Sequence, residues 1–203
     1  MKRIYGIGVG PGDSDYITLR GYKLIRGADV VFLPSNGGKS LAGEIAEKFI
    51  DDKKRVYIEF PMGKDNSKRY KEAADTVDDH LKDGGEGVFL TLGDPMVYST
   101  FSYIMTELEK IGINVESIPG ISSFNAAANR IKMPLASKGQ KFYLTDGDVD
   151  EDILKYFDTV CILKTSRNKE KVLDMLERYG FAYTYIKRCD DYMSLILGRR
   201  KND

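Results

Sequence analysis

Three glycine-containing segments carry the residues of this chain best suited to bind a small molecule. They are Gly6–Asp13 (GIGVGPGD), Thr91–Thr100 (TLGDPMVYST) and Ile118–Phe124 (IPGISSF). Glycines let a backbone approach a ligand closely, and a hydroxyl at the start of a helix can either cap that helix or bind a ligand. Both roles are open for Ser99 and Thr100, and a turn between a strand and a helix would have this composition without any ligand.

Two nucleotide-binding patterns fail in register. A GxGxxG fingerprint in the first segment would need glycine at Pro11 or at Asp13, depending on where it starts, and no acidic residue ends the second expected strand. The run 38–40 (GKS) resembles the end of a P-loop, but the earlier glycine of that motif falls on Leu33. We therefore expect neither NAD binding nor ATP hydrolysis, and we expect Ser40 to cap the next helix.

The histidine and cysteine content argues against metal and triad chemistry. The single histidine, His80, lies in a polar stretch typical of a solvated helix face. Cys161 lies in an apolar run and is expected to be buried, whereas Cys189 lies in a polar connection where it could be exposed. Neither cysteine belongs to a CxxC pair, so the sequence predicts no zinc site and no disulfide framework, and it names no catalytic residue.

Charge and hydropathy limit the partners. Lys plus Arg and Asp plus Glu both number 31, so the formal net charge is zero. This balance gives no general attraction to nucleic acid or to an anionic membrane. No segment has the ~20 apolar residues of a membrane helix, and the glycine-interrupted start does not read as a signal peptide. A soluble, cytoplasmic protein is expected.

Short apolar runs alternate with helical periodicity along the chain. This alternation predicts an α/β fold with mainly parallel strands and helices on both sides. We expect a boundary near Ile118 that separates an N-terminal domain (1–118) from a C-terminal domain (119–203), each an αβα unit. The expected strands are 4–9, 30–33, 56–60, 88–92, 115–118, 142–144, 160–163, 183–186 and 194–197, and the expected helices are 18–27, 41–50, 68–82, 99–111, 123–131, 151–157 and 169–179.

The three segments, in this order, resemble the tetrapyrrole (corrin/porphyrin) methylases, which are class III S-adenosyl-L-methionine (SAM)-dependent methyltransferases. Smaller matches lie at 60–62 (FPM) and 134–136 (PLA), and the resemblance covers nearly the whole chain. Within the family, 92–104 and 118–136 look most like the branch that methylates carbon 20 of precorrin-2 or cobalt-factor II. The uroporphyrinogen III branch carries an aspartate after the second strand, where this chain has Pro34.

The resemblance implies SAM as cofactor, bound between the two domains, a reduced tetrapyrrole as substrate, a role in cobalamin biosynthesis, and a homodimer. It implies no metal. Lys39, Arg130, Lys132 and Lys138 could pair with the substrate carboxylates, although each could equally be a solvated surface charge. The residues expected to bind the cofactor, with Ser99 and Thr100 added from their position alone, are Pro11, Leu92, Gly93, Asp94, Val97, Ser99, Thr100, Ser122, Ser123 and Lys164.

The C-terminal region departs from the family pattern. Only a few residues separate Lys187 from the last expected strand, which predicts a tight β-hairpin where family members carry further structure near the adenine side of the pocket. A shortened C-terminal domain predicts weaker cofactor binding or lost activity. Two other functions therefore remain open: a non-catalytic relative that binds a tetrapyrrole or a pathway partner, and a methylase of the same fold with another acceptor, as in diphthine synthase.

Overall fold

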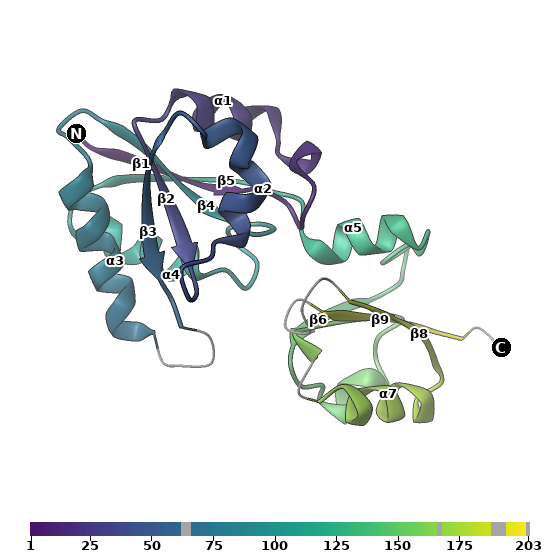
Figure 1. The fold of residues 1–203 in the computed structure, drawn as a ribbon. Coiled ribbons are helices and arrows are strands. Elements are labelled where there is room, and N and C mark those ends of the chain that lie inside the picture. The colour runs from purple at the N-terminus through teal and green to yellow at the C-terminus, as the bar shows by residue number, and fades with distance from the viewer. Residues whose placement is uncertain (62–65, 166–167, 188–193, 202–203) are drawn as a thin grey trace. The chain divides into compact units, whose positions relative to one another are not determined.

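The computed structural model describes residues 1–61, 66–165, 168–187 and 194–201. The chain forms two compact units, Met1–Ser123 and Phe124–Asp203, and both contain a sheet with flanking helices (Figure 1). Each unit is described by itself below. Within the described residues no helix is long and apolar enough to cross a membrane.

The first unit contains a five-stranded sheet in the order β3-β2-β4-β1-β5. The central strands β1 (Arg3–Gly8) and β4 (Glu86–Thr91) pair in parallel, with Ile7 opposite Leu90. The remaining strands also pair in parallel, and they are β2 (Val30–Ser35), β3 (Lys54–Glu59) and β5 (Asn114–Ile118). The parallel sheet predicted from the alternation of elements is thus confirmed.

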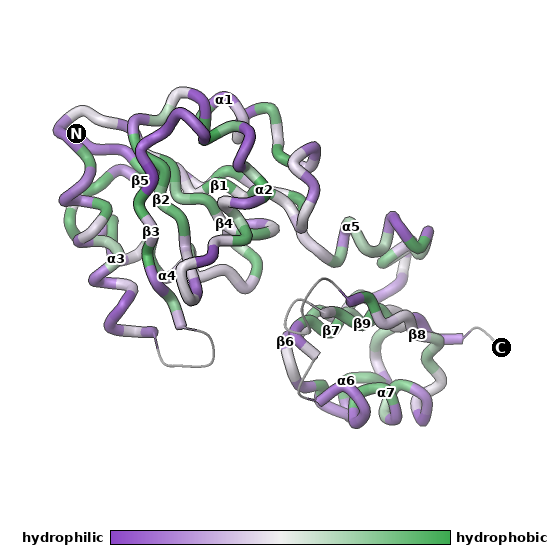
Figure 2. The backbone as a smooth tube through the Cα atoms, in the orientation of Figure 1, coloured by the Kyte–Doolittle hydropathy of each residue, from purple (hydrophilic) through white to green (hydrophobic). Residues whose placement is uncertain are grey.

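Helices cover both faces of this sheet. Alternate strand residues supply the two cores: Phe32 and Phe89 pack with α3 (Ser67–His80) and α4 (Thr100–Lys110). Their neighbours on the same strands pack on the other face with α1 (Leu19–Gly27) and α2 (Leu41–Ile50). The inner strands β2 and β4 are buried on both faces and apolar along most of their length (Figure 2). A short 3-10 helix, η1 (Ser14–Tyr16), precedes α1.

Three helices of this unit begin at hydroxyl caps. The side chains of Thr18, Ser40 and Ser99 each accept a hydrogen bond from a backbone N–H in the first turn of α1, α2 and α4, respectively. Such a bond satisfies one of the donors that a helix start leaves unpaired. The cap predicted at Ser40 is therefore confirmed, and the GKS run is the entry to a helix.

The second unit contains a four-stranded mixed sheet in the order β6-β7-β9-β8. Strands β6 (Phe142–Asp146) and β7 (Thr159–Leu163) are parallel, and β9 (Leu195–Arg200) pairs antiparallel with both β7 and β8 (Phe181–Ile186). One face packs against α5 (Ser123–Arg130). The other packs against α6 (Glu151–Leu154) and α7 (Lys169–Arg178). The predicted α/β class holds for both units.

The cysteine and histidine predictions have different outcomes. Cys161 is fully buried, as predicted, and burial raises the pKa of its thiol to about 12. Cys189 lies outside the described residues. The His80 ring is half-buried rather than solvated, because it packs edge-on against Phe32 with ring centroids 6.5 Å apart. Its Nδ1 lies 2.9 Å from the Thr76 carbonyl oxygen.

Candidate functional site

The strand order of the first unit has a topological switch point where β1 and β4 end, and the name crevice is used for this part of the carboxyl edge. These two strands are neighbours, yet β1 leads into α1 on one face of the sheet and β4 leads into α4 on the other. When two adjacent parallel strands lead into helices on opposite faces of the sheet, the two loops separate at the carboxyl edge. Open α/β sheets bind their ligands at this position. The loops at this edge are 9–13, 92–99 and, after β5, 119–122.

Three glycines from the three glycine-containing segments meet at this edge, backbone against backbone. A Cβ on Gly120 would lie 2.1 Å from the Gly93 carbonyl oxygen and 2.7 Å from Gly8 Cα. A Cβ on Gly8 would lie 2.4 Å from the same carbonyl oxygen. Since real Cβ atoms essentially never approach another atom this closely, only glycine fits at Gly8 and Gly120.

Two hydrogen bonds join the first two loops. The Gly93 N–H donates to the Gly10 carbonyl oxygen at 2.9 Å, and the Gly10 N–H donates back to the Gly93 carbonyl oxygen at 3.3 Å. Gly93 adopts φ 70°, a left-handed conformation that costs glycine little and other residues more. The pairing fixes the glycine-rich loop against the start of the 92–99 loop.

Asp94 connects the second loop to the third. Its Oδ1 accepts from the Met96 N–H at 2.8 Å, and its Oδ2 accepts from the Gly120 N–H at 3.0 Å. The carboxylate therefore holds the backbone of both loops. The sequence predicted Asp94 only as a pocket residue, and these contacts give it a structural task as well.

Ser99 is the N-cap residue of α4. Its Oγ accepts from the Phe101 N–H at 3.2 Å and lies 2.9 Å from Thr91 Oγ1, and the residue is buried. Of the two roles open to Ser99, the structure thus shows the helix cap. Thr100 is the first residue of α4 and is half-buried. Ligand contact by either hydroxyl remains a prediction.

The other predicted residues of the first unit lie along the same edge. Pro11 and Val97 are half-buried, Leu92 packs against the α1/α2 core, Ser122 is buried, and Ser123 begins α5. Between Val97 and Ser99, Tyr98 has φ 47° with 49% of its surface exposed. An exposed aromatic residue in the left-handed region is uncommon and tends to mark functional sites.

Lys164 belongs to the second unit. It directly follows β7 with φ 54°, and its Nζ lies 3.1 Å from Asp146 Oδ2. Its role in cofactor binding stays a prediction. The other proposed carboxylate partners are exposed: Lys39 in the first unit, and Arg130, Lys132 and Lys138 in the second.

The charge of the three loops separates ligand classes. Segments 9–13, 92–99 and 119–122 contain Asp13 and Asp94 and no lysine or arginine. Phosphate sites in proteins normally add cationic side chains to the backbone donors. The loops therefore suit a neutral or cationic ligand better than a nucleotide phosphate, which agrees with the failed nucleotide motifs. Among the described residues, no group of three His, Cys, Asp or Glu could hold a metal ion.

Glu59 was not singled out from the sequence. At the end of β3 it accepts from the Ser35 hydroxyl at 2.7 Å and from the Gly37 N–H. These bonds hold the pKa of the Glu59 carboxyl below its usual range. Glu59 thereby anchors the 36–39 turn that carries Lys39. A lone carboxylate at a strand end gives no local signal of this role, because its partners lie on a neighbouring strand.

Comparison with known proteins identifies the family. The family model of the tetrapyrrole (corrin/porphyrin) methylases matches residues 3–189. The chain belongs to this family. Over 191 residues it is 36% identical to the "probable cobalt-precorrin-2 C(20)-methyltransferase" of Methanocaldococcus jannaschii, covering 93% of this chain and 83% of that protein. Over 190 residues it is 29% identical to the cobalt-precorrin-2 C(20)-methyltransferase of Salmonella typhimurium, covering 88% and 79%.

Solved structures of tetrapyrrole methylases share the fold. A cobalt precorrin-4 methyltransferase aligns with a TM-score of 0.79 at 22% identity, covering 97% of this chain and 94% of that one. The uroporphyrin-III C-methyl transferase of Thermus thermophilus, complexed with S-adenosyl homocysteine, aligns with a TM-score of 0.68 at 22% identity, covering 97% and 88%. The family resemblance read from the three segments is therefore confirmed.

Proposed function

We propose that this protein is a SAM-dependent methyltransferase that methylates carbon 20 of precorrin-2 or cobalt-precorrin-2 in cobalamin biosynthesis. Family membership and the names of the two relatives support this activity. The observation in this chain that carries the proposal is the glycine-lined crevice without cations at the carboxyl ends of β1 and β4. Its three loops are the three segments on which the family resemblance rests.

The crevice residues fit SAM in charge. Gly8, Gly93 and Gly120 pack backbone against backbone, so the three loops are held together at this edge. SAM carries a sulfonium and an ammonium group, and the loops offer it the Asp13 and Asp94 carboxylates with no opposing lysine or arginine. We assign cofactor contacts to the residues predicted from the sequence in these loops and at the helix starts that follow them, which are Pro11, Leu92, Gly93, Asp94, Val97, Ser99, Thr100, Ser122 and Ser123.

Alignment of the reactants is the main catalytic task left to the protein. When bound, SAM supplies an electrophilic methyl group, and an electron-rich carbon of a reduced tetrapyrrole can attack it directly. Holding two reactants in line can contribute about 7–11 kcal/mol. The paired Gly10 and Gly93 and the doubly bonded Asp94 make the loops rigid enough for this purpose. The absence of a predicted nucleophile or base from the sequence is consistent with such a mechanism.

Two measurements test the proposal. Titration calorimetry with S-adenosylhomocysteine should give a dissociation constant in the micromolar range. Anaerobic incubation with SAM and cobalt-precorrin-2 should raise the mass of the tetrapyrrole by one CH2, because a methyl group replaces a hydrogen that leaves as a proton. Folded protein that binds S-adenosylhomocysteine but transfers no methyl group to precorrin-2 or cobalt-precorrin-2 would contradict the proposed reaction.

A non-catalytic tetrapyrrole-binding relative is the second candidate. Only residues 187–194 separate β8 from β9, whose paired register places Ile186 opposite Leu195. The family resemblance places further structure in this region. Undetectable S-adenosylhomocysteine binding alongside retained tetrapyrrole binding would favour this candidate. Binding of S-adenosylhomocysteine with methyl transfer to a different acceptor would instead favour a change of substrate.

We also propose that the protein is a homodimer, as the family resemblance implied, and that it acts in the cytoplasm. Sedimentation equilibrium tests the first statement, because the 22.9 kDa chain would sediment at twice that mass. Fractionation of the producing cells tests the second. A monomer at micromolar concentration, or recovery of the protein with the membranes, would contradict the respective proposal.

A further inference from the structure

A stack of aromatic rings joins the beginnings of α3 and α4 in the first unit. The rings of Tyr70 and Tyr103 lie nearly parallel, at 8°, with centroids 4.9 Å apart. Behind them, the Phe60 ring lies 6.2 Å from Tyr70. Tyr70 and Phe60 pack against the α3/α4 core, whereas 59% of Tyr103 is exposed. A large, rigidly backed apolar ring thus remains open to solvent.

Three basic residues neighbour Tyr70 in the sequence. Lys68, Arg69 and Lys71 all lie in the first turns of α3, and no acidic residue lies in the first turn. Cations at the start of a helix oppose its macrodipole, so the arrangement is unfavourable without an anion. Arg69 donates to the Glu59 carbonyl oxygen at 3.4 Å. Within the described part of the chain, Lys68 and Lys71 form no ion pair, not even with the acids four residues further along the helix.

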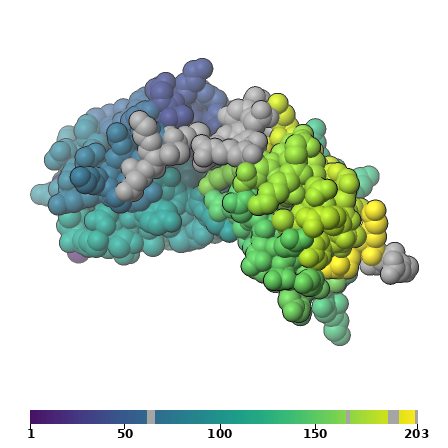
Figure 3. Space-filling view, turned by 90° about the horizontal axis from the view of Figure 1, so that it is seen from below, coloured from purple at the N-terminus to yellow at the C-terminus, as the bar shows by residue number. Residues whose placement is uncertain are grey.

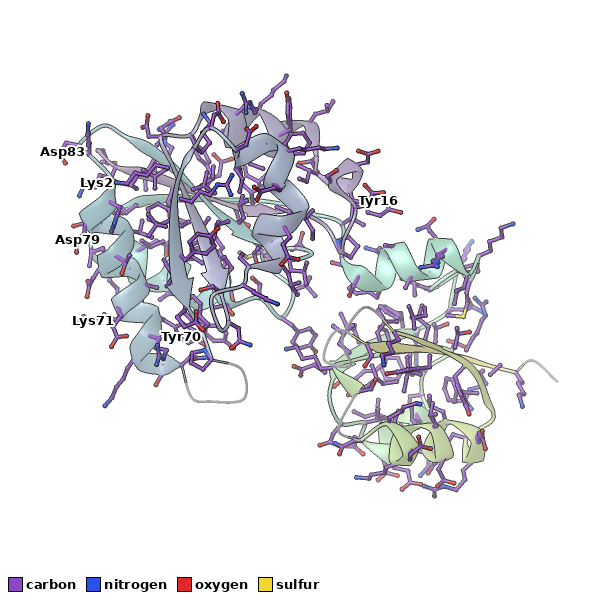
Figure 4. All side chains as sticks on the ribbon, viewed as in Figure 1. Lys2, Tyr16, Tyr70, Lys71, Asp79 and Asp83 are labelled. Carbon is purple, nitrogen blue, oxygen red and sulfur yellow. The ribbon has the colours of Figure 1, made fainter. Side chains whose placement is uncertain are left out.

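The stack lies on the same edge of the sheet as the crevice. Helices α3 and α4 follow β3 and β4, so both begin where the parallel strands end. In Figure 4 the Tyr70 and Lys71 side chains project from the lower end of α3, where the arrow of β3 also ends. Figure 3 shows the molecule from that side. The edge therefore has a crevice without cations after β1 and β4, and an aromatic surface with cations after β3.

We propose that Tyr103, backed by Tyr70, forms a specificity surface for the tetrapyrrole acceptor together with the cations in the first turns of α3, Lys68, Arg69 and Lys71. This inference rests on the proposed function and adds residues that it leaves unassigned. A tetrapyrrole offers a broad conjugated face and many carboxylates. The conjugated face matches the exposed Tyr103 ring, and the carboxylates match the three cations. In this arrangement the cationic SAM binds at the crevice, which has no cations, and the polycarboxylate tetrapyrrole binds beside the cations of α3.

The test measures acceptor affinity separately from cofactor affinity. Cobalt-precorrin-2 is titrated anaerobically by absorbance against full-length Tyr103→Ala, Tyr103→Phe and Lys68→Gln/Lys71→Gln proteins, and S-adenosylhomocysteine is titrated by calorimetry. Tyr57→Ala is the matched aromatic control, because Tyr57 is 53% exposed and alternates along β3 to the opposite face from Ile58. Lys82→Gln is the charge control, because Lys82 follows the far end of α3.

We expect Tyr103→Ala to bind the acceptor about five- to tenfold more weakly, while Tyr103→Phe, which keeps the ring face, stays near the unmodified protein. The double lysine variant should lose about two- to fivefold and show a shallower dependence on salt. S-adenosylhomocysteine binding and both controls should stay unchanged.

Unchanged acceptor affinity in both test variants overturns the surface and leaves the proposed reaction standing. An unmodified protein that binds no tetrapyrrole overturns both proposals. A lower sedimenting mass of Tyr103→Ala would identify the surface as a contact between copies of the chain, and that result also overturns the proposal. Circular dichroism establishes that each variant is folded. If Tyr103→Ala does not fold, Tyr103→Phe remains as the variant of this residue for the comparison.

Discussion

Substituting Gly120 by alanine tests whether close backbone packing builds the crevice. The new Cβ would lie 2.1 Å from the Gly93 carbonyl oxygen and 2.7 and 2.8 Å from the backbone of Gly8. No side-chain rotation can relieve these contacts, because every atom involved belongs to a backbone. The loops must separate by about an ångström to reach the 3.0 Å below which real Cβ contacts are essentially absent.

The expected cost is about 1–3 kcal/mol of folding free energy, the usual range for overpacking, and the upper part of the range applies because the backbone must move. This corresponds to a Tm lower by about 3–10 °C. Separation of the loops also stretches the Gly120 N–H bond to Asp94. A misplacement of this size can reduce catalysis by about a hundredfold. Differential scanning calorimetry, titration with S-adenosylhomocysteine and the methyl-transfer assay measure the three effects.

Gly27→Ala is the matched control. A Cβ at Gly27, the last residue of α1, has no atom within 4 Å, so this variant should keep its Tm or gain slightly and should bind S-adenosylhomocysteine normally. A Gly120→Ala protein with unchanged Tm and unchanged affinity for S-adenosylhomocysteine would refute the explanation that close backbone packing builds the crevice. A lower Tm with unchanged affinity would keep the packing argument but separate it from ligand binding.

Three further variants or measurements address the site and the core. Asp94→Asn should cost about 1–2 kcal/mol and weaken S-adenosylhomocysteine binding, because one of its two backbone bonds is lost. Asp29→Ala, which removes the acceptor of the Glu86 N–H at the other end of the sheet, should cost stability without affecting the ligand. Ser99→Ala should cost about 1–2 kcal/mol, like the cap variant Ser40→Ala, and a larger loss of S-adenosylhomocysteine affinity in Ser99→Ala alone would show that Ser99 also binds the ligand. In a Cys189→Ser protein, Cys161 should react with a disulfide reagent only after unfolding, because burial raises the pKa of the thiol to about 12. The matching contribution to stability should be complete below about pH 9, the ordinary thiol value, and be lost as the pH rises toward 12, so rapid native-state labelling near pH 8 would contradict the burial.

Local pattern determined the elements and their class. The apolar runs at 4–9 and 88–92 overlap β1 and β4, which begin one and two residues earlier, and the helical periodicity at 41–50 coincides with α2. Apolar periodicity is a local property of the sequence, so helices and strands can be predicted from it without knowing the fold. The order of the three glycine segments sufficed to place the chain in its family. The sequence does not match the GxGxxG motif of dinucleotide-binding loops, and the three loops contain no lysine or arginine.

Tertiary structure decided which of these residues act on one another. Nothing in the sequence says that Gly8, Gly93 and Gly120 touch, because β1, β4 and β5 are brought together only by the strand order of the sheet. The same applies to Asp94, whose partner N–H lies 26 residues away. The stack of Tyr70 on Tyr103 likewise depends on two helices covering the same face. The sequence by itself thus determined the elements and the family. The contacts that shape the crevice and the aromatic surface follow from long-range packing, which no local pattern encodes.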